Sequence, residues 1–281
     1  MKIPNIKNPK VSVLISNYNN SSFLKRCIKS VEKQNYKNKE IIVVDNQSSD
    51  DSLDVLRDFK DIVVIAKKKK LYIGSYDQIN AYKIALNYSS GEIILFLDSD
   101  DYFANKKIVE VVKYFMKNGD KNIIMDRPII FFNKKKKIKL IQKTRSNLFI
   151  PWPRFSPQSC ISIRRNYLLK IYKLISIKKF PSIWLDFRII VFTFIKNKDI
   201  NIINKFLTFY QQSEGSANTA YKLFSKNWWI RRKEAHDYFN YVNLKVNNRK
   251  YYSFDFFISK FFNYFLNNEK NSNYRKKKFY R

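Results

Sequence analysis

Apolar residues in the first hundred positions form short unbroken runs that alternate with stretches of helical spacing. The runs are rich in β-branched residues and end at polar residues or Gly, which predicts strands at 10–16, 40–45, 61–66 and 92–98. Helices are expected from about Ser22, within the polar segment 46–59, and from Gly74 to about Tyr88. Strands that are apolar throughout and alternate with helices predict a parallel sheet covered on both faces.

The pattern becomes less regular after residue 103. Helical spacing and β-branched runs predict a helix at 105–119, one or two strands within 123–132, a basic loop entering a strand at 134–145, a proline-rich loop at 151–159, helices at 164–175 and 182–197, and a strand at about 200–212. From about Ser216 the composition shifts, with 15 Lys or Arg against 4 Asp or Glu in residues 216–281. This part is expected to be a basic helical extension.

Residues 251–268 predict a helix with one apolar face, formed by Phe254, Phe257, Ile258, Phe261, Phe262 and Phe265. This predicted apolar face has two interpretations, docking onto the rest of the chain or lying on an anionic membrane surface beside Lys and Arg. Trp228 and Trp229 have three interpretations, which are stacking on a sugar acceptor, contact with a lipid interface and packing in the core. His236, the single histidine, is expected on the surface of a helix, which argues against a zinc site or a histidine-based triad.

Polar side chains follow three of the predicted strands at the point where each strand ends. Tyr18 follows the first, Asp45 ends the second, and Asp98, Asp100 and Asp101 follow the fourth. Ligands of parallel α/β sheets bind beyond the carboxyl ends of the strands, so these side chains are expected to converge there. Two carboxylates two residues apart on an extended chain share a face, and Mn²⁺ or Mg²⁺ prefers such oxygen ligands together with phosphate. A divalent cation bridging to a diphosphate is therefore expected.

The formal net charge of +32, from 55 Lys or Arg against 23 Asp or Glu, favours a polyanionic partner. A chain with this charge attracts nucleic acid, anionic lipid and phosphorylated substrates alike, so the charge does not distinguish among them. Cys27 and Cys160 match no metal or redox spacing, which indicates free thiols in a reducing compartment. The first residues lack a signal-peptide core, and no apolar run approaches the roughly 20 residues of a membrane span. We therefore expect a cytoplasmic location.

Two segments carry a resemblance to a known family. KVSVLISNYNNSSFLKRCIKSVEKQNYKNKEIIVVDNQSSDDSLDVL, followed by GEIILFLDSDD, resembles the nucleotide-sugar-binding half of family-2 glycosyltransferases, continuously over about 10–105. Residues 185–218 resemble the acceptor half more weakly. The resemblance implies an α/β, GT-A-like fold with a mostly parallel Rossmann-like sheet and helices on both faces. It implies a catalytic domain at 1–215, divided into a donor half (10–105) and an acceptor half (106–215), followed by a basic aromatic helical extension at 216–281.

The resemblance implies roles for residues at the ends of the first two strands. The family places an aromatic side chain on the nucleotide base after the first strand, and Tyr18 matches it, with Ser16 beside it in the binding site. The acid that ends the second strand reads the base edge, and Asp45 matches it.

The acids after the fourth strand are similarly assigned. The resemblance implies that Asp98 contacts the ribose and metal region, that Asp100 is the direct metal ligand, and that Ser99 belongs to the nucleotide-sugar site. Asp101 continues the family's run of acids in a supporting role. The implied cofactor is a divalent cation, Mn²⁺ or Mg²⁺.

The family's general base is an acid at the start of a helix before a Tyr-Arg-Gln-like segment, and Asp186 matches it by its distance from Tyr210. Alternative roles for Asp186 are a helix cap or an ion pair with Arg188. Three positions depart from the family. The base segment of the family usually carries a pair of acids or His-Asp, whereas Leu185-Asp186 offers a lone carboxylate. Tyr72 replaces a usual Asn or Arg, so that phosphate contacts are expected from Lys67 to Lys70, and Gln211 replaces a usual Arg.

The implied activity is inverting transfer of a sugar from a nucleotide sugar, expected to be UDP-linked, to a glycan or lipid-linked acceptor. Cell-surface polysaccharide or lipopolysaccharide-type synthesis is the expected process, and peripheral attachment to the inner face of the membrane is left open. The alternative is a basic nucleic-acid-binding protein without catalytic activity. It leaves the acidic cluster unexplained, because carboxylates repel phosphate unless a metal intervenes. No nucleic acid partner is therefore expected.

Overall fold

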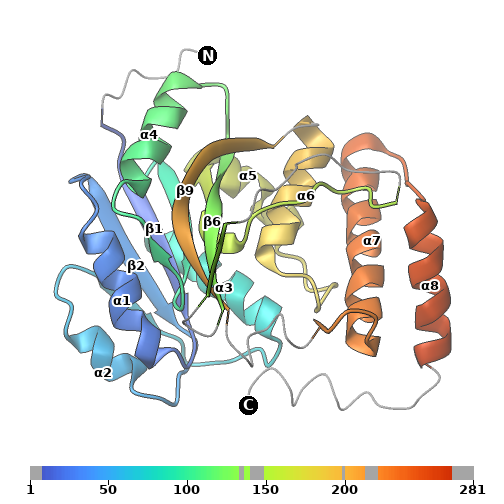
Figure 1. The fold of residues 1–281 in the computed structure, drawn as a ribbon, viewed down its shortest axis with the longest axis horizontal. Coiled ribbons are helices and arrows are strands. Elements are labelled where there is room, and N and C mark those ends of the chain that lie inside the picture. The colour runs from blue at the N-terminus through green and yellow to red at the C-terminus, as the bar shows by residue number, and fades with distance from the viewer. Residues whose placement is uncertain (1–7, 133–135, 140–148, 198–199, 213–220, 268–281) are drawn as a thin grey trace.

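A mixed sheet runs through the centre of the protein (Figure 1). The computed structural model describes residues 8–132, 136–139, 149–197, 200–212 and 221–267. Within these ranges the strands are β1 (Val11–Asn17), β2 (Lys39–Asp45), β3 (Val63–Ala66), β4 (Ile93–Asp98), β5 (Tyr102–Phe103), β6 (Ile123–Phe132), β7 (Lys136–Lys139), β8 (Ile161–Arg164) and β9 (Asn201–Gln212). Their order is β3-β2-β1-β4-β8-β6-β9-β5, and β7 pairs with β6.

The four strands predicted near the N-terminus form the parallel half of the sheet. β1 lies between β2 and β4, and its register places Asn17 opposite Asp45 and Ser16 opposite Asp98. The carboxyl ends of β1, β2 and β4 therefore meet at one edge, which we call the rim. In the other half, β8 is antiparallel to both β4 and β6, whereas β9 is parallel to β6. Residues 123–132 form one strand, because register shifts between Met125 and Pro128 accommodate the proline.

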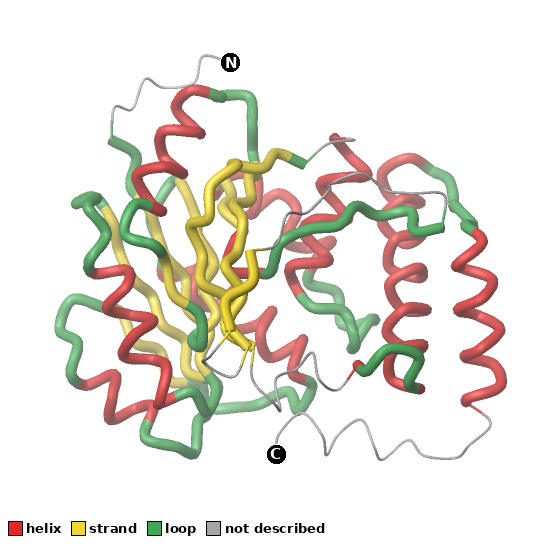
Figure 2. The backbone as a smooth tube through the Cα atoms, viewed as in Figure 1, coloured by secondary structure: helices red, strands yellow, loops and turns green. Residues whose placement is uncertain are grey.

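Helices cover both faces of the sheet, as the apolar strands predict (Figure 2). They are α1 (Ser21–Glu32), α2 (Ser52–Arg57), α3 (Gly74–Tyr88), α4 (Lys107–Lys117), α5 (Arg165–Ile175), α6 (Leu185–Asn197), α7 (Lys226–Asn247) and α8 (Phe254–Asn267). Alternate residues of β1 point to opposite faces, so Val13 packs with α1 and α4, whereas Leu14 packs with α3, α5 and α6. In the described ranges, no helix combines the length and apolar character that crossing a membrane requires.

The basic extension contributes α7 and α8. Tyr238, Phe239 and Val242 of α7 join the hydrophobic cluster that contains α6. α8 lies beside α7 at the edge of the molecule (Figure 1). The extension is thus continuous with the core on one face of the sheet.

The prediction that His236 lies on the surface is wrong. The side chain is 1% exposed, and its Nε2 lies 2.6 Å from Asp255 Oδ2 of α8 in a hydrogen bond. Trp152 contacts the same ring, with centroids 4.7 Å apart. Burial favours a raised pKa for Asp255, but hydrogen bonds from His236 and Arg232 outweigh it and lower the pKa. The charged sequence around His236 suggested solvent exposure, whereas α8 covers this face of α7.

A polar junction joins the amino-terminal ends of β1, β2 and β4. The carboxylate of Glu40 pairs with Lys10 at 2.7 Å and accepts hydrogen bonds from Ser12 Oγ and the Ser90 backbone N–H. Gly91 is required here because a Cβ atom would lie 2.4 Å from Ser12 Oγ. Burial acts to raise the pKa of Glu40, but these hydrogen bonds dominate and lower the pKa to about 2.

We expect Glu40→Gln to reduce stability at neutral pH and to have little effect in acid. The folded pKa of Glu40 lies below its ordinary value of 4.5, so its stabilisation is present above that value and is lost as pH falls toward about 2. Urea unfolding midpoints followed by circular dichroism between about pH 3 and pH 7 measure this difference. Glu32→Gln, at an exposed site on α1, is the control. A difference in unfolding midpoint between Glu40→Gln and the parent that stays constant across this pH range would contradict the expectation.

Candidate active site

Asp98 ends β4 at the rim and is held by α3. Its Oδ1 accepts hydrogen bonds from Tyr82 Oη at 2.8 Å and Gln78 Nε2 at 3.1 Å. Burial is the main cause that raises the pKa of Asp98 to about 7, and the charge of Asp100 raises it further. The sequence did not predict a role in the site for Gln78 or Tyr82. Their spacing of four residues on a predicted helix, which places both on one face, was the available signal.

Asp100 is the second acid of the turn. Burial raises its pKa to about 6, whereas the charge of Arg26 opposes the rise. The Arg26 guanidinium donates a hydrogen bond to the Asp100 backbone carbonyl at 3.2 Å and lies 4.3 Å from the ring centroid of Tyr102. Arg26 belongs to α1, so α1 places a positive charge beside the acidic turn.

Asp101 anchors the turn to the other half of the sheet. It is fully buried, and its Oδ1 accepts a hydrogen bond from the Gln211 backbone N–H at 2.8 Å. Its Oδ2 accepts one from Ser159 Oγ, and Ser159 Oγ in turn accepts one from the Asp98 backbone N–H at 3.0 Å. This arrangement fits the supporting role expected for Asp101.

A buried ion pair fixes the backbone at Ser159. Lys107 Nζ is fully buried and donates hydrogen bonds of 2.6 Å to Asp126 Oδ2, the Ser159 carbonyl and Thr208 Oγ1. Burial raises the pKa of Asp126, and the Lys107 charge opposes that rise. The ion pair therefore connects α4, β6 and β9 to the residue that bonds Asp98 and Asp101.

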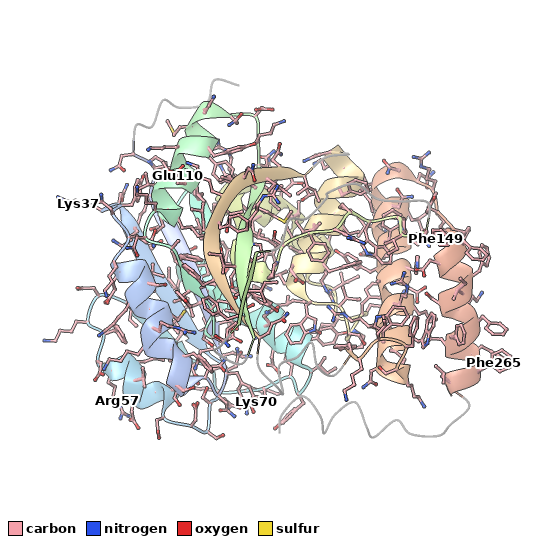
Figure 3. All side chains as sticks on the ribbon, viewed as in Figure 1. Lys37, Arg57, Lys70, Glu110, Phe149 and Phe265 are labelled. Carbon is pink, nitrogen blue, oxygen red and sulfur yellow. The ribbon has the colours of Figure 1, made fainter. Side chains whose placement is uncertain are left out.

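The base-binding candidates lie at the ends of β1 and β2. Lys70 Nζ lies 4.4 Å from the ring centroid of Tyr18 and donates to its hydroxyl at 3.2 Å; Lys70 is labelled in Figure 3. Asp45 is fully buried, and it accepts hydrogen bonds from Asn17 Nδ2, Ser48 Oγ and the Ser48 backbone N–H. In this structure Asp45 therefore orders the loop that follows β2.

Ser16 and Ser99 bond to neighbouring loops. Ser16 Oγ accepts a hydrogen bond from Asn46 Nδ2 at 3.2 Å. Ser99 is buried, and its hydroxyl accepts a hydrogen bond from Asn20 Nδ2 at 2.9 Å. Ser99 thus links the acidic turn to the loop before α1.

The expected phosphate contact by Lys67 is not what the structure shows. Lys67 is buried and pairs with Asp77 at 2.7 Å, and it also donates to Asn46 Oδ1 at 2.8 Å. The expectation fails for Lys67 because Asp77, at the start of α3, supplies a buried counter-charge. Lys70 lies beside Tyr18, as described above.

Asp186 lies in the first turn of α6. Burial raises its pKa, and the charge of Arg231 on α7 acts against that rise. Its own charge in turn raises the pKa of Asp98, so the two carboxyl groups face a common region. Asp186 is therefore near the rim, although it lies 88 positions further along the chain than Asp98.

The structure does not show the proposed ion pair between Asp186 and Arg188. The Arg188 guanidinium is fully buried and donates to the backbone carbonyls of Ile175, Ile177, Phe180 and Ile183 at 2.7–2.9 Å. Arg188 therefore braces the loop that leads into α6, and it fixes the position from which Asp186 projects.

Tyr210 lies among the acidic groups. Its pKa is raised mainly by burial and additionally by Asp101, Asp100, Asp98 and Asp186. In the sequence, Tyr210 indicated only the distance to Asp186 and was not predicted to belong to the site. The structure adds it to the site as a residue of β9 that lies near all four carboxylates.

Asp98 and Asp100 fit a hard divalent cation. Burial raises the pKa of both carboxyl groups, and the charge of Asp100 raises that of Asp98 further, an unfavourable arrangement that a bound cation would relieve. Mg²⁺ commonly takes one or two protein carboxylates and completes its shell with water and phosphate oxygens, so two carboxylates suffice. Among the described residues there is no group of three or more His, Cys, Asp or Glu arranged to hold a metal.

The parallel half of the sheet, with an acidic turn after β4, defines an α/β fold with a candidate ligand site at the carboxyl ends of its strands. Residues 12–172 match the family model described as Glycosyl transferase family 2. An uncharacterized glycosyltransferase of Nostoc sp. is 30% identical over 212 residues, which cover 72% of this chain and 64% of the relative. The chain belongs to glycosyltransferase family 2.

A second relative has a defined activity. A UDP-Glc:alpha-D-GlcNAc-diphosphoundecaprenol beta-1,3-glucosyltransferase of Escherichia coli is 36% identical over 104 residues, which cover 37% of this chain and 40% of that protein. The chain thus spans less than two thirds of the length of these relatives.

Solved structures confirm the GT-A-like fold. TarS of S. aureus, as a fragment in complex with UDP, gives a TM-score of 0.58 at 14% identity and covers 96% of this chain and 74% of that chain. A mannosyltransferase of Pyrobaculum calidifontis in complex with GDP-Man and Mn²⁺ gives a TM-score of 0.50 at 15% identity and covers 92% of this chain and 70% of that chain. At these identities the likeness shows the fold alone.

We expect Lys107→Met to destabilise the fold by about 3–5 kcal/mol, because it leaves Asp126 buried without its counter-charge. The control is Lys205→Met, which removes an exposed ion pair with Glu110 and should change stability by less than about 1 kcal/mol. Free energies of unfolding from urea titration provide the comparison. Equal losses of unfolding free energy in the two variants would show that the buried pair stabilises the fold no more than the exposed pair does.

Proposed function

We propose that the protein is an inverting, metal-dependent glycosyltransferase that uses a nucleotide sugar, with UDP as the nucleotide. The acceptor is a glycan or a lipid-linked saccharide in cell-surface polysaccharide or lipopolysaccharide-type synthesis. The observation that carries the proposal is the convergence of Asp98 and Asp100 after β4 with Asp186 of α6, three partly buried carboxyl groups with raised pKa values, at one rim. Family membership favours this function over a basic nucleic-acid-binding protein.

The proposed donor and acceptor derive from the relatives' names. The E. coli relative uses UDP-Glc and a diphosphoundecaprenol-linked sugar, and a relative from Bacillus spizizenii is a poly(ribitol-phosphate) beta-glucosyltransferase. TarS has been solved with UDP and with UDP-GlcNAc. These relatives support a UDP-linked donor and an acceptor that belongs to a cell-surface polymer or its lipid-linked precursor.

The donor half is proposed to bind the nucleotide between the ends of β1, β2 and β4. Tyr18 packs on the base, with Ser16 beside it. Asp45 has no exposed surface here, so it reads the base edge after the loop that it orders through Asn17 and Ser48 has opened to admit the nucleotide. Ser99 contributes by holding Asn20.

Asp98 and Asp100 would hold the Mn²⁺ or Mg²⁺ ion, with Asp98 also near the ribose. Bound there, the cation would offset negative charge on the departing nucleoside diphosphate. Tyr82 and Gln78 orient Asp98, and the bonds of Asp101 to Ser159 and to β9 keep the turn in place.

Asp186 is proposed to act as the general base in the acceptor half. Its carboxylate takes the proton of the acceptor hydroxyl while that oxygen bonds to the anomeric carbon and the bond to the diphosphate breaks. A single displacement of this kind inverts the anomeric centre. Burial in the α6 turn raises the pKa of Asp186, which makes it a stronger base than an exposed aspartate.

The metal role predicts that Asp100→Ala weakens Mn²⁺-dependent UDP binding by at least about tenfold, roughly 1.4 kcal/mol. Thermal shift with UDP, with and without Mn²⁺, measures the effect. Asp58→Ala is the control because Asp58, the residue after α2, is 59% exposed and is not one of the rim residues. Undiminished metal-dependent stabilisation of Asp100→Ala would place the cation elsewhere.

The base role predicts that Asp186→Asn retains UDP-sugar binding but loses transfer by about 10²–10⁴-fold, because asparagine cannot accept the proton. Product formation is measured with UDP-glucose and a synthetic diphosphate-linked acceptor, and binding by calorimetry. Transfer at the parental rate would remove Asp186 from the mechanism, whereas a loss of binding alone would give it a donor-site role.

A further inference from the structure

α8 packs onto α7 through its polar face. Asp255, Ser259 and Asn263 recur at four-residue intervals and are all buried. Asp255 pairs with Arg232 at 2.7 Å and with His236, and Asn263 Nδ2 donates to the Trp229 carbonyl at 2.7 Å. These polar contacts fix the rotation of the helix.

The opposite face of α8 is aromatic and exposed. The residues of this exposed aromatic face are Phe254, Phe257, Phe261, Tyr264 and Phe265, each 58–70% exposed. Their spacing of three, four or seven residues makes one continuous surface along the helix. The interpretation in which the predicted apolar face docks onto the rest of the chain is therefore wrong for most of that face. Phe262 and Ile258 are exceptions, since the ring of Phe262 stacks on Trp229 with centroids 4.3 Å apart and Ile258 is half-buried.

The apolar surface continues past the end of α8 onto the start of α7. Phe224, which is 67% exposed, lies 6.1 Å from Trp229 between ring centroids, and Trp229 bridges to Phe262. Leu223 is also 67% exposed. Phe224 has φ of 60°, an unfavourable backbone conformation for a bulky residue, so local structure holds this ring outward at a conformational cost.

Among the described residues, two lysines flank this surface. Lys260 is exposed on α8 itself, and Lys222 lies beside Leu223. After α8 the sequence continues with six Lys or Arg and one Glu in residues 268–281. A second copy of the chain would bring the same positive charge to the contact, whereas an anionic surface complements it. Charge therefore favours a lipid surface over self-association.

The rim and the C-terminal end of α8 point to the same side of the molecule. Lys70, beside Tyr18 at the rim, and Phe265, near the end of α8, both lie in the lower part of Figure 3. A bilayer that contacts this end of α8 therefore lies toward the end of the molecule where Lys70 marks the rim.

We propose that the exposed aromatic face of α8, with Leu223 and Phe224, docks the protein onto an anionic lipid bilayer. The aromatic rings enter the headgroup region while neighbouring Lys and Arg meet anionic headgroups. The consequence for catalysis rests on the proposed function: docking presents the rim to an acceptor anchored in the same bilayer. The lipid contact itself does not depend on sugar transfer.

Flotation of the full chain with vesicles tests the docking. The parent should float with phosphatidylglycerol-containing vesicles and much less with pure phosphatidylcholine. The triple variant Phe257→Gln, Phe261→Gln, Phe265→Gln should lose at least about tenfold in vesicle affinity, because three exposed apolar anchors are removed. Its circular dichroism and its hydrolysis of UDP-glucose in solution should match those of the parent, since these side chains are exposed and distant from the rim.

The matched control changes three exposed apolar residues elsewhere, Leu53→Gln, Tyr88→Gln and Met116→Gln, and should float like the parent. Asp100→Ala should also float, so that loss of catalysis and loss of docking are separable. Absence of flotation by the parent, or equal flotation by the α8 triple variant, would overturn the proposal. So would a parental dimer that the triple variant dissociates and that does not float, since it would assign the face to a second copy.

Discussion

Gathering three carboxyl groups, one fully and two partly buried, at the end of one strand is the constraint on which the rest of the structure depends. Asp98, Asp100 and Asp101 repel one another, and burial raises the pKa of each. The protein compensates with hydrogen bonds from Tyr82, Ser159 and the β9 backbone and with the nearby charge of Arg26. Most of these groups come from different elements, so the turn keeps its shape only while the mixed half of the sheet is in place.

The mixed half of the sheet thus has a role in the chemistry as well as in the fold. The Lys107–Asp126 pair and Thr208 lock the backbone at Ser159, which bonds both Asp98 and Asp101. On the other face, Arg188 organises the loop before α6 through four backbone carbonyls. Buried cations therefore help to position both the proposed metal ligands and the proposed base, so part of the rigidity of the site comes from outside the donor half.

The sequence predicted the parallel half of the sheet well because its signals are local. Unbroken apolar runs, polar turns and helical spacing gave the order of elements from β1 to β4, and the strand ends located Tyr18, Asp45 and Asp98. Prediction failed where the partner of a side chain lies on a different element, even when that element is close in the chain. Lys67 was expected to contact phosphate, but Asp77 of α3 neutralises it. His236 was expected on the surface, because no local pattern indicates that α8 covers it.

The sequence by itself determined that α8 would have an aromatic face, since helical periodicity alone dictates which residues share a side. It also determined that acids would follow β4. Only the tertiary structure decided that α8 turns its polar face inward, because Arg232, His236 and the Trp229 carbonyl satisfy Asp255 and Asn263 there. Only it brought Asp186 and Tyr210 to those acids, because burial and hydrogen bonding between remote segments depend on how the chain packs and not on any local pattern.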